Sequence, residues 1–483
     1  MSSSQLPPLS LTCEVKFPSK DDNPQDHVVR WSGIHVSVPA VVVIPESESD
    51  VVAAIVYAKD NSLRVVVAGG GHAPFIPVTA KTLYLDLRRF KSIVLDEGAS
   101  TVTIGGGVLT GELHTYLLER GFYATLPNSS AVGVVGAVLG VGNGPFNSLH
   151  GFMADNVESV RIVTLPKEGA AASHDISHSS TGADERSLFA AVCGAGHGLG
   201  VIVSMTLRAY KVADLRLDGG DQVWNRRGVF PAPVIRDAAR AFVSLLPLTG
   251  PANATLLIAR SPPNMPRPGS PIAMLVAAHF GPSAEAEASP AAKILLGEDF
   301  AAKAAVSVTE GVPLAKLNAS TEPFNAVGGS KILSGTYLHS INEDVIVSLF
   351  ERFVAFTNER PDLWNTYIAI PTWNTTKSLQ LGASPERKDN FHVARDRNVL
   401  VLSAVWSKTG GADIESESST YSAEIQEIAG RDESGPLIGF ANNLAFPAKL
   451  ADYYPADKVD ELARVKTQWD PNGLFWSPSM GVE

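Results

Sequence analysis

The feature that most constrains this chain is an apolar run that leads into three glycines and a histidine, Val65-Val66-Val67-Ala68-Gly69-Gly70-Gly71-His72-Ala73-Pro74. Glycine lacks a Cβ, so this loop can adopt unusual dihedral angles and bring its N–H groups against a charged group such as a pyrophosphate. Pro74 biases Ala73 towards an extended conformation, so we expect coil here rather than the helix that follows a Rossmann dinucleotide loop. His72 would then lie beside the phosphates as a nucleophile or ligand, although Gly-Gly-His alone also fits a turn with a partly exposed histidine.

The composition limits the kinds of molecule that this protein is expected to bind. Of the 483 residues, 45% are hydrophobic and 18% are charged, which is ordinary for a globular protein with a sizeable core. The net charge of −11 argues against nucleic-acid binding, and no apolar run is long enough to span a membrane. The first ten residues lack the basic and apolar regions of a secretory signal. We therefore expect a cytoplasmic protein, monomer or homodimer, that acts on a small molecule, with Cys13 and Cys193 as unpaired thiols.

The pattern of the first 210 residues predicts alternating strands and helices. Strands are expected at 40–44, 65–68, 83–87, 101–104, 157–165 and 201–207, and helices after Ser47 and over 111–120. Ser47 with Asp50 has the spacing of a capping box. The polar segment 168–184 is expected to be a loop.

Residues 126–145 are glycine-rich and barely charged, so we expect them to be buried against a ligand or another backbone. Beyond about residue 211 the sequence pattern changes. It predicts strands such as 273–278 and 399–405, together with several helices. A last amphipathic helix is expected over 458–468.

Two further motifs each have a functional and a structural interpretation. Gly105-x-Gly107-x-x-x-Gly111 lies between a strand and a helix, as a nicotinamide dinucleotide fingerprint does, but Thr125 and its neighbours supply no acidic residue for the ribose. A structural tight turn is the favoured reading. His174 and His178 have the spacing of metal ligands on a helix, but their polar segment lacks an apolar face, so we predict a solvated loop and no metal site.

One ordered set of motifs extends over the first 210 residues and the last 30: Pro39, Pro45, Asp50-Val51 and Ala58; Gly70-Gly71-His72; Leu85-Asp86-Leu87; Gly105-Gly106-Gly107 with Gly111-Glu112-Leu113; Val132-Gly133, Gly136, Gly140 and Gly142; Gly151 with Asp155-Asn156-Val157; Gly196, Gly198 and Gly200-Val201; and Arg464-Val465-Lys466 with Asp470-Pro471-Asn472. As a set it resembles the FAD-linked oxidases with a vanillyl-alcohol-oxidase-type (PCMH-type) FAD domain, specifically the berberine-bridge-enzyme-like branch common in fungal and plant metabolism. The resemblance implies an α+β fold. A two-part FAD-binding domain would span 1–210, with 431–483 returning to it, and an α/β substrate domain with a large antiparallel sheet would span 211–430.

The resemblance also implies the cofactor site. His72 matches the histidine that bonds covalently to the 8α-methyl group of the flavin, and Ser129 stands where the family often has a second, cysteine tether. We therefore expect FAD attached through His72 only. A valine at the position of Val132 is associated with oxygen access, which favours an oxidase over a dehydrogenase, with molecular oxygen as acceptor. The expected FAD-binding residues are His72, Ala68, Gly69, Gly70, Gly71, Ala73, Pro127, Ser129, Ser130, Val132, Gly133, Gly136, Gly140, Asn143, His150, Val157, Gly200 and Val201.

Three departures from the family pattern bear on the chemistry. Ala68-Gly69 replaces the arginine or serine usual before Gly-Gly-His, and the usual glycine run appears as Gly140-Val141-Gly142-Asn143-Gly144. Cofactor binding should survive both. The family's Tyr-x-Asn-Tyr appears as Phe440-Ala441-Asn442-Asn443, so a tyrosine that often works in catalysis is missing.

A flavin oxidase also needs a base for the substrate O–H or N–H. Tyr454 is the first candidate, followed by Tyr367 and His392. Candidate substrate-binding residues are Trp364, Trp373, Arg387, Trp406 and Asn442, although aromatic residues at such spacings are also common in protein cores.

The aromatic content of the second domain favours a small aromatic, polyketide-like or alkaloid-like secondary metabolite. Three alternatives stay open: a carbohydrate or oligosaccharide oxidase, a flavoprotein that assists a non-redox cyclisation or isomerisation, and a nicotinamide dehydrogenase that uses Gly105–Gly111.

Overall fold

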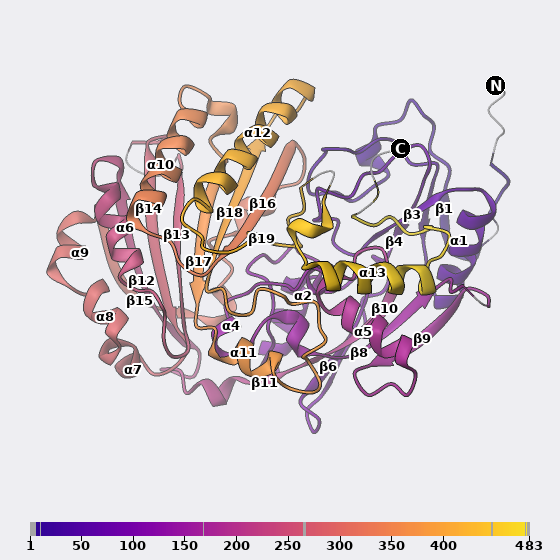
Figure 1. Ribbon diagram of the computed structural model, residues 1–483, viewed down its shortest axis with the longest axis horizontal. Helices are drawn as coiled ribbons and strands as arrows, with labels where there is room; N and C mark the ends of the chain where they lie inside the picture. The colour runs from indigo at the N-terminus through magenta and orange to yellow at the C-terminus, as the bar shows by residue number, and fades with distance from the viewer. Residues whose placement is uncertain are drawn as a thin grey trace.

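The computed structural model describes residues 6–9, 11–167, 169–263, 267–445, 448–478 and 480. Within these residues the strands form two lobes that lie side by side in Figure 1. The first lobe, indigo to magenta, holds the strands up to residue 211, and the yellow C-terminal helix lies across it. The second lobe, pink to orange, is built on one large sheet. The predicted α+β class is confirmed, whereas the domain boundaries at residues 210 and 430 stay a prediction.

The first sheet has the order β1-β2-β4-β3, with β2, β4 and β3 parallel to one another. Its strands are β1 (Glu14–Lys16), β2 (Val41–Ile44), β3 (Arg64–Ala68) and β4 (Thr82–Asp86). Helix α1 (Glu48–Asp60) packs on this sheet and begins at the predicted capping box, in which Ser47 Oγ accepts from Asp50 N and Asp50 Oδ2 accepts from Ser47 N. The β-α-β unit therefore places β3 at the edge of this sheet, and the glycine loop follows directly after it.

The second sheet is antiparallel, in the order β5-β6-β10-β8-β9. Its strands are β5 (Ile93–Asp96), β6 (Thr101–Gly105), β8 (Val157–Thr164), β9 (Ala172–Ser177) and β10 (Val201–Arg208). Because β6 pairs antiparallel on both sides, Gly105–Gly111 does not belong to the parallel β-α-β unit of a nicotinamide dinucleotide site. That alternative is excluded.

Strand β9 corrects one prediction. Within segment 168–184, predicted to be a loop, residues 172–177 form an edge strand on β8, while residue 168 lies outside the described residues. An edge strand is held by backbone hydrogen bonds and can be polar on both faces, so its composition resembled that of a loop. His174 is part of this strand, and its ring packs edge-on against Trp469 at 4.9 Å.

The remaining helices of the first lobe connect or cover these sheets. They are α2 (Thr110–Leu118), α3 (Val134–Leu139), α4 (Asn147–His150), α5 (Ala183–Ala195) and α13 (Ala456–Trp469), and β7 (Phe122–Tyr123) pairs with β11 (Tyr210–Lys211). Short 3-10 turns of the chain lie at Pro24–Asp26, Met153–Asn156, Val212–Leu215, Ala232–Val234, Leu314–Lys316, Glu322–Asn325, Pro361–Leu363 and Leu450–Asp452.

The second lobe contains an eight-stranded antiparallel sheet in the order β15-β12-β14-β13-β17-β18-β16-β19. The strands are β12 (Gln222–Pro231), β13 (Ala252–Arg260), β14 (Pro271–His279), β15 (Val306–Pro313), β16 (Ser330–Leu338), β17 (Tyr367–Trp373), β18 (Val399–Ser407) and β19 (Ile438–Gly439). The helices are α6 (Ile235–Val243), α7 (Ser283–Ala288), α8 (Pro290–Leu295), α9 (Glu298–Lys303), α10 (Glu343–Thr357), α11 (Thr376–Gly382) and α12 (Ala412–Ala429).

The two faces of this sheet have different neighbours. Alternate residues such as Leu256, Ile258 and Ile370 are buried in one apolar core with α6, α10 and α12. Residues of the opposite face contact the first lobe, because Tyr337 and Trp373 share a cluster with Val141 and Phe152. The sheet therefore presents its free face to the glycine-rich part of the first lobe.

The C-terminal segment returns to β3. Val65 N donates to Leu474 O at 2.9 Å, and Trp476 N donates to Val65 O at 3.1 Å. Asp470 fixes this return, since its carboxylate accepts from Leu474 N at 2.8 Å, from Phe475 N at 3.0 Å and from Lys466 Nζ at 2.5 Å. Lys466 Nζ also donates to Gly198 O, so one ion pair holds two segments of the first lobe together.

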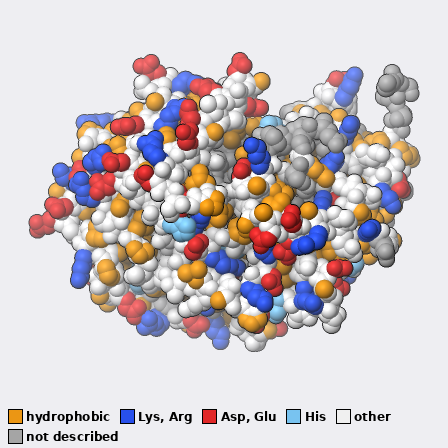
Figure 2. Space-filling model, viewed as in Figure 1, with side chains coloured by type: hydrophobic (Ala, Val, Ile, Leu, Met, Phe, Trp, Pro, Cys, Tyr) orange, Lys and Arg blue, Asp and Glu red, His pale blue; other side chains and the backbone are white. Residues whose placement is uncertain are grey.

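One face of the molecule carries charges of both signs. On the face shown in Figure 2, Lys and Arg side chains are interspersed with Asp and Glu side chains, without the basic stripe typical of a nucleic-acid interface. In the described part of the chain, no helix has the length and apolarity needed to cross a membrane. Cys13 and Cys193 are both buried and unpaired.

We predict that Asp470→Ala lowers the free energy of unfolding by about 3 kcal/mol, because it leaves the half-buried Lys466 ammonium without its carboxylate and frees the C-terminal return. Urea denaturation followed by circular dichroism measures this change. Asp460→Ala, an exposed position on α13, is the matched control and should be within about 0.5 kcal/mol of wild type. Equal stability of the two variants would show that the ion pair does not hold the return.

Candidate flavin site

The loop after β3 presents unpaired backbone donors. Among the described residues, the N–H groups of Gly69, Gly70, Gly71 and Ala73 donate to no acceptor, although the loop is half-buried. Consecutive N–H groups left free in a glycine turn form a concave site for an anion. The predicted pyrophosphate-binding role of this loop fits that geometry.

Two glycine loops meet here backbone to backbone. A Cβ on Gly70 would lie 2.6 Å from Gly133 N, and a Cβ on Gly133 would lie 2.7 Å from Gly70 N. Gly69 is equally close to Gly106, whose carbonyl oxygen would lie 2.8 Å from an added Cβ. Any side chain at these positions would push the loops apart, so the glycines are required by contact as well as by conformation.

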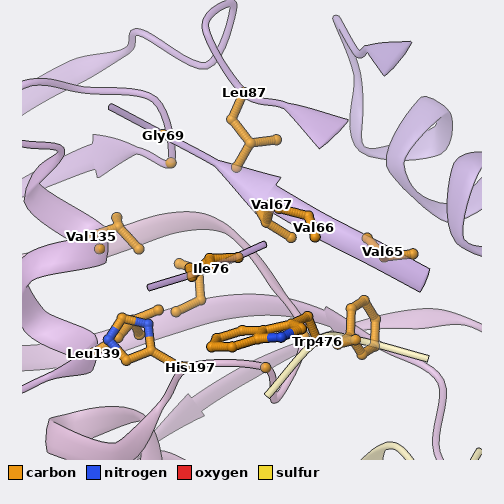
Figure 3. A pocket seen from close by; sticks show the side chains of 16 residues that line it. Val65, Val66, Val67, Gly69, Ile76, Leu87, Val135, Leu139, His197 and Trp476 are labelled. Carbon is orange, nitrogen blue, oxygen red and sulfur yellow. The ribbon is translucent and has the colours of Figure 1, made fainter. Parts of the chain in front are cut away.

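A pocket continues from this loop into the first lobe (Figure 3). It is lined by Val65, Val66, Val67, Gly69, Ile76, Leu87, Gly106, Val135, Gly136, Leu139, His197, Gly198, Gly200, Ile202, Phe475 and Trp476. His197 and Trp476 lie along one side of it, opposite Val66 and Val67. The walls are thus mainly aliphatic, which suits a flat ring system.

The pocket also contains unsatisfied polar atoms. His197 Nε2 and Trp476 Nε1 are buried, and neither has a hydrogen-bond partner among the described residues. Burial lowers the pKa of His197 to about 4, so its imidazole is neutral at neutral pH. A nucleotide ring or ribose in the pocket would supply partners for these two atoms. Together with the free N–H groups of the loop, these atoms fit the adenine dinucleotide part of FAD.

His72 lies at the other end of the loop. Its ring is stacked on Trp31, with the centroids 4.3 Å apart and the planes at 14°. Its Nε2 is buried and has no hydrogen-bond partner within the described part of the chain. Burial, with a smaller contribution from the Lys331 ammonium, lowers the pKa of His72 to about 4. The imidazole is therefore neutral at neutral pH and has a free nitrogen, as a nucleophile requires.

The second lobe reaches His72 through aromatic residues. Trp406 on β18 packs edge-on against Trp31 at 6.2 Å, and Phe324 contacts Tyr367 at 4.8 Å. Lys331 on β16 lies over the rings of both Trp31 and Trp406. Of the sequence-based candidates, Trp406 thus contacts Trp31, the stacking partner of His72, and Tyr367 contacts Phe324, whose carbonyl oxygen accepts from Trp31 Nε1.

The segment around Ser129 is also tied to the second lobe. Ser129 Oγ donates to Asn325 Oδ1 at 2.5 Å, and Asn325 Nδ2 donates to Ser130 Oγ at 3.1 Å. Pro127 O accepts a longer bond from Asn318. Residues 127–130 therefore lie at the junction of the lobes.

Other expected FAD-binding residues have structural partners. Val132 O accepts from Thr110, and Asn143 Oδ1 accepts from Asn147. Gly140 O accepts from Asn442 Nδ2 at 2.9 Å, which brings a candidate substrate residue against the glycine-rich segment. Gly136 and Gly200 line the pocket, and Val157 and Val201 are the fully buried first residues of β8 and β10.

His150 lies in a separate aromatic cluster. Its ring is stacked on Tyr210 at 3.5 Å, and its Nε2 is 2.7 Å from the Tyr123 hydroxyl. Burial lowers the pKa of His150 to about 3. A direct contact with FAD stays a prediction for this residue.

Tyr454 and His392, two of the three base candidates, are fully enclosed. Tyr454 Oη donates to Gly194 O at 2.7 Å, and burial raises the pKa of this phenol well above its usual value. His392 Nδ1 lies 3.6 Å from Asp155 Oδ2, and burial lowers the pKa of His392 to about 4. Arg395 also pairs with Asp155, so these groups form a buried charged cluster.

The other substrate candidates are dispersed. Arg387 is buried and donates to Asp155 O and Glu158, and Trp373 packs against Phe152 and Tyr337. Trp364 is 36% exposed, and its ring lies beside Gly269. The structure therefore places Arg387 and Trp373 at the contact between the lobes and Trp364 at the surface.

Four residues near the site were not predicted from the sequence: Trp31, Lys331, His197 and Trp476. His197 had a local signal, a histidine enclosed by the glycines of 194–200. Trp31 and Lys331 are 300 residues apart, so no local pattern relates them.

We predict that Gly70→Ala lowers the molar ratio of flavin to purified protein on the order of tenfold, because forcing an atom into filled space costs about 1–3 kcal/mol and displaces the loop. Flavin absorbance relative to protein concentration measures this ratio. Gly98→Ala is the control, since its Cβ would have only an ordinary contact with Asp96 in an exposed turn. Undiminished flavin in Gly70→Ala would contradict the assigned role of the loop.

The comparisons with known proteins point to the same cofactor. Residues 39–170 match the family described as an FAD binding domain. The chain is 26% identical over 490 residues to the FAD-linked oxidoreductase tazL of Aspergillus terreus, a match that covers 97% of this chain and 91% of that protein. It is 33% identical over 249 residues to the (R)-6-hydroxynicotine oxidase of Paenarthrobacter nicotinovorans, covering 51% of this chain and 50% of that protein.

A solved structure extends the likeness to the whole fold. BBE-like 1 of Physcomitrella patens superposes with a TM-score of 0.74 at 18% identity, covering 97% of this chain and 96% of that one. The expected fold and FAD as the cofactor are confirmed, whereas covalent attachment stays a prediction. Over nearly its whole length the chain is similar to FAD-linked oxidoreductases such as tazL, and it has a berberine-bridge-enzyme-like fold.

Proposed function

We propose that this FAD-linked oxidoreductase is an oxidase of a small, apolar, ring-containing secondary metabolite, with FAD attached covalently through His72 alone. One observation carries the proposal: the neutral imidazole that directly follows the glycine loop stacks on Trp31 and has a buried Nε2 without a partner among the described residues. FAD, when bound, supplies the redox chemistry by accepting a hydride at N5 and passing two electrons to molecular oxygen, which leaves as hydrogen peroxide.

The covalent attachment is consistent with the state of His72. One bond forms between a ring nitrogen and the 8α carbon, while that carbon and the imidazole N–H each lose a proton. Molecular oxygen takes up the two protons and two electrons as hydrogen peroxide. The neutral ring that this step needs is favoured by burial. Ser129 offers only a hydroxyl that is already bonded to Asn325, which supports attachment at one residue.

The free face of the large sheet supports an apolar substrate. Two rows of laterally paired residues lie on this face. The first passes through β16, β18, β17, β13 and β14, and the second passes through β17, β13 and β14. The first row is Gly335, Leu402, Ala369, Leu257 and Met274, and the second row is Pro371, Thr255 and Val276. From β16 to β14 no side chain in these rows is charged and only Thr255 has a polar group, whereas on β12 the second row continues with Arg227. An oligosaccharide would need many more hydrogen-bonding groups, so this wall favours a ring compound over a sugar.

One relative is named for a substrate of this class. The name of (R)-6-hydroxynicotine oxidase gives a small ring-containing molecule as the substrate of that protein. The same class of compound would fit the apolar rows of this chain.

Among the three base candidates, we propose that Tyr367 contacts the substrate. It lies on the free face, opposite Ala404 in the ladder and beside Phe324. Burial raises the pKa of Tyr367 to about 12, so at neutral pH its phenol holds a proton and orients a substrate oxygen or nitrogen rather than accepting one. Tyr454 is less suitable because its hydroxyl already donates to Gly194 O.

One observation favours the non-redox alternative. Asn443, where the family often has a tyrosine, is buried, and its Nδ2 has no partner in the residues that the structure describes. A flavoprotein that uses this amide to assist a cyclisation would produce no peroxide during turnover, which separates it from the oxidase.

We predict that the purified protein is yellow and that its colour stays in the pellet after acid precipitation, because a covalent bond survives unfolding. His72→Ala should release the colour into the supernatant. His174→Ala, which removes a histidine of edge strand β9, is the matched control and should keep the colour in the pellet. A yellow supernatant from wild type would keep FAD and contradict the covalent link. Peroxide formation with ring-containing substrates tests the oxidase itself.

We also predict that Val132→Leu slows reoxidation of the reduced protein by oxygen on the order of tenfold or more, because the added methylene enlarges a half-buried side chain next to Gly133, which contacts the loop. Stopped-flow mixing of the photoreduced protein with oxygenated buffer measures this rate. Val94→Leu on β5 is the control for added volume, because this side chain is exposed and lies outside the pocket lining. Equal reoxidation of wild type and Val132→Leu would contradict the role of Val132 in oxygen access.

A further inference from the structure

A short segment before the first parallel strand holds the His72 loop. This strap, residues 30–33, bonds the loop on both sides of the histidine. Trp31 N donates to Gly71 O at 3.0 Å, and Arg30 Nη2 donates to Ala73 O at 2.7 Å and to Ile76 O at 2.5 Å. The strap therefore fixes the backbone that carries His72, while the Trp31 ring covers one face of its imidazole.

The same strap is bonded to the second lobe. Trp31 Nε1 donates to Phe324 O at 2.8 Å, and Gly33 N donates to Gly329 O at 2.8 Å. Ser32 Oγ accepts from Lys331 N and donates to Lys331 O. The position of the Trp31 ring thus depends on both lobes.

Lys331 is the buried cation of this junction. It is 1% exposed, and its Nζ donates to Trp31 O at 2.6 Å, Ala326 O at 2.7 Å and Gly328 O at 2.6 Å. The same atom lies 4.5 Å from the centroid of the Trp31 ring and 4.4 Å from that of Trp406. Among the described residues it forms no ion pair. Three carbonyl groups and two ring faces therefore offset the cost of burying this charge.

We infer that Lys331 and Trp31 form a positioning device that holds the His72 imidazole, in its neutral form, for attachment of the flavin. The inference rests on the covalent link proposed above. Trp31 restricts the ring to one plane by stacking on it, and Lys331 fixes Trp31 through its carbonyl and its ring. The charged groups that face His72 are Lys331 and Arg30, both cations, so both disfavour a protonated imidazole. The nucleophile is thereby oriented and kept unprotonated.

A consequence is that attachment depends on docking of the lobes. His72 and Trp31 belong to the first lobe, and Lys331 and Trp406 to the second. The device is complete only when the two lobes are in contact, so covalent flavin would report correct assembly of the whole chain.

The test uses the full chain, produced as apoprotein in a host starved of riboflavin and then incubated with FAD. Flavin fluorescence of the denatured protein gives the rate of covalent attachment as a function of pH. Lys331→Met should attach FAD on the order of tenfold more slowly than wild type, because the ring is no longer held in place. The acidic limb of its pH profile should move to higher pH, since loss of the cation raises the pKa of His72.

Two further variants separate positioning from folding. Trp31→Leu removes the stacking ring but keeps the strap backbone, and it should also attach FAD slowly. Trp31→Phe keeps the stack and should stay within about threefold of wild type. Lys458→Met is the matched control, because Lys458 Nζ likewise donates to a carbonyl, Asp389 O, and lies 4.5 Å from a ring, that of Phe391.

The outcomes distinguish the two proposals. No covalent flavin in wild type would overturn the attachment to His72 itself. Covalent flavin in wild type, with an unchanged rate and pH profile in folded Lys331→Met, would overturn the positioning device. If Lys331→Met does not fold, Trp31→Leu decides in the same way: slow attachment supports the device, and a wild-type rate overturns it.

Discussion

The backbone contact between Gly70 and Gly133 is the constraint on which the site depends. It brings the loop after β3 against the glycine-rich segment before α3 with no room for a side chain. The contact leaves the N–H groups of Gly69, Gly70 and Gly71 free at the mouth of the pocket, where an anion can bind them. The aliphatic pocket extends from one end of this loop, and His72 lies at the other. The geometry of the site therefore follows from two loops that only glycine allows to meet.

The chemistry of His72 depends on a second contact, between the lobes. Its stacking partner Trp31 is bonded to Phe324 O, and the ammonium of Lys331 lies over the Trp31 ring. Burial and the Lys331 charge both lower the pKa of His72 and so favour its neutral form. The large sheet that carries Lys331 also provides the apolar rows proposed to bind the substrate. One arrangement of the lobes thus serves attachment of the cofactor and recognition of the substrate.

Much of the first lobe could be predicted from the sequence because its signals are local. The capping box of α1, the strand before the glycine loop and the loop itself each have a pattern within a few residues. Strand β9 was predicted to be a loop because backbone hydrogen bonds, rather than apolar alternation, hold it at the sheet edge. Trp31 and Lys331 could not be related in advance, since their contact joins residues 300 positions apart. The substrate residues were similarly difficult, because a tryptophan such as Trp373 looks the same in a sequence whether it packs between lobes or lines a site.

The central claim is that FAD extends from the aliphatic pocket, across the glycine loop, to His72. A crystal structure of the protein purified with its flavin tests it most directly. The account predicts electron density for adenine between Val66 and Trp476, phosphate oxygens within hydrogen-bonding distance of Gly69, Gly70 and Gly71, and continuous density between His72 and the flavin ring. FAD bound at another glycine turn, or phosphates that make no contact with this loop, would contradict the account.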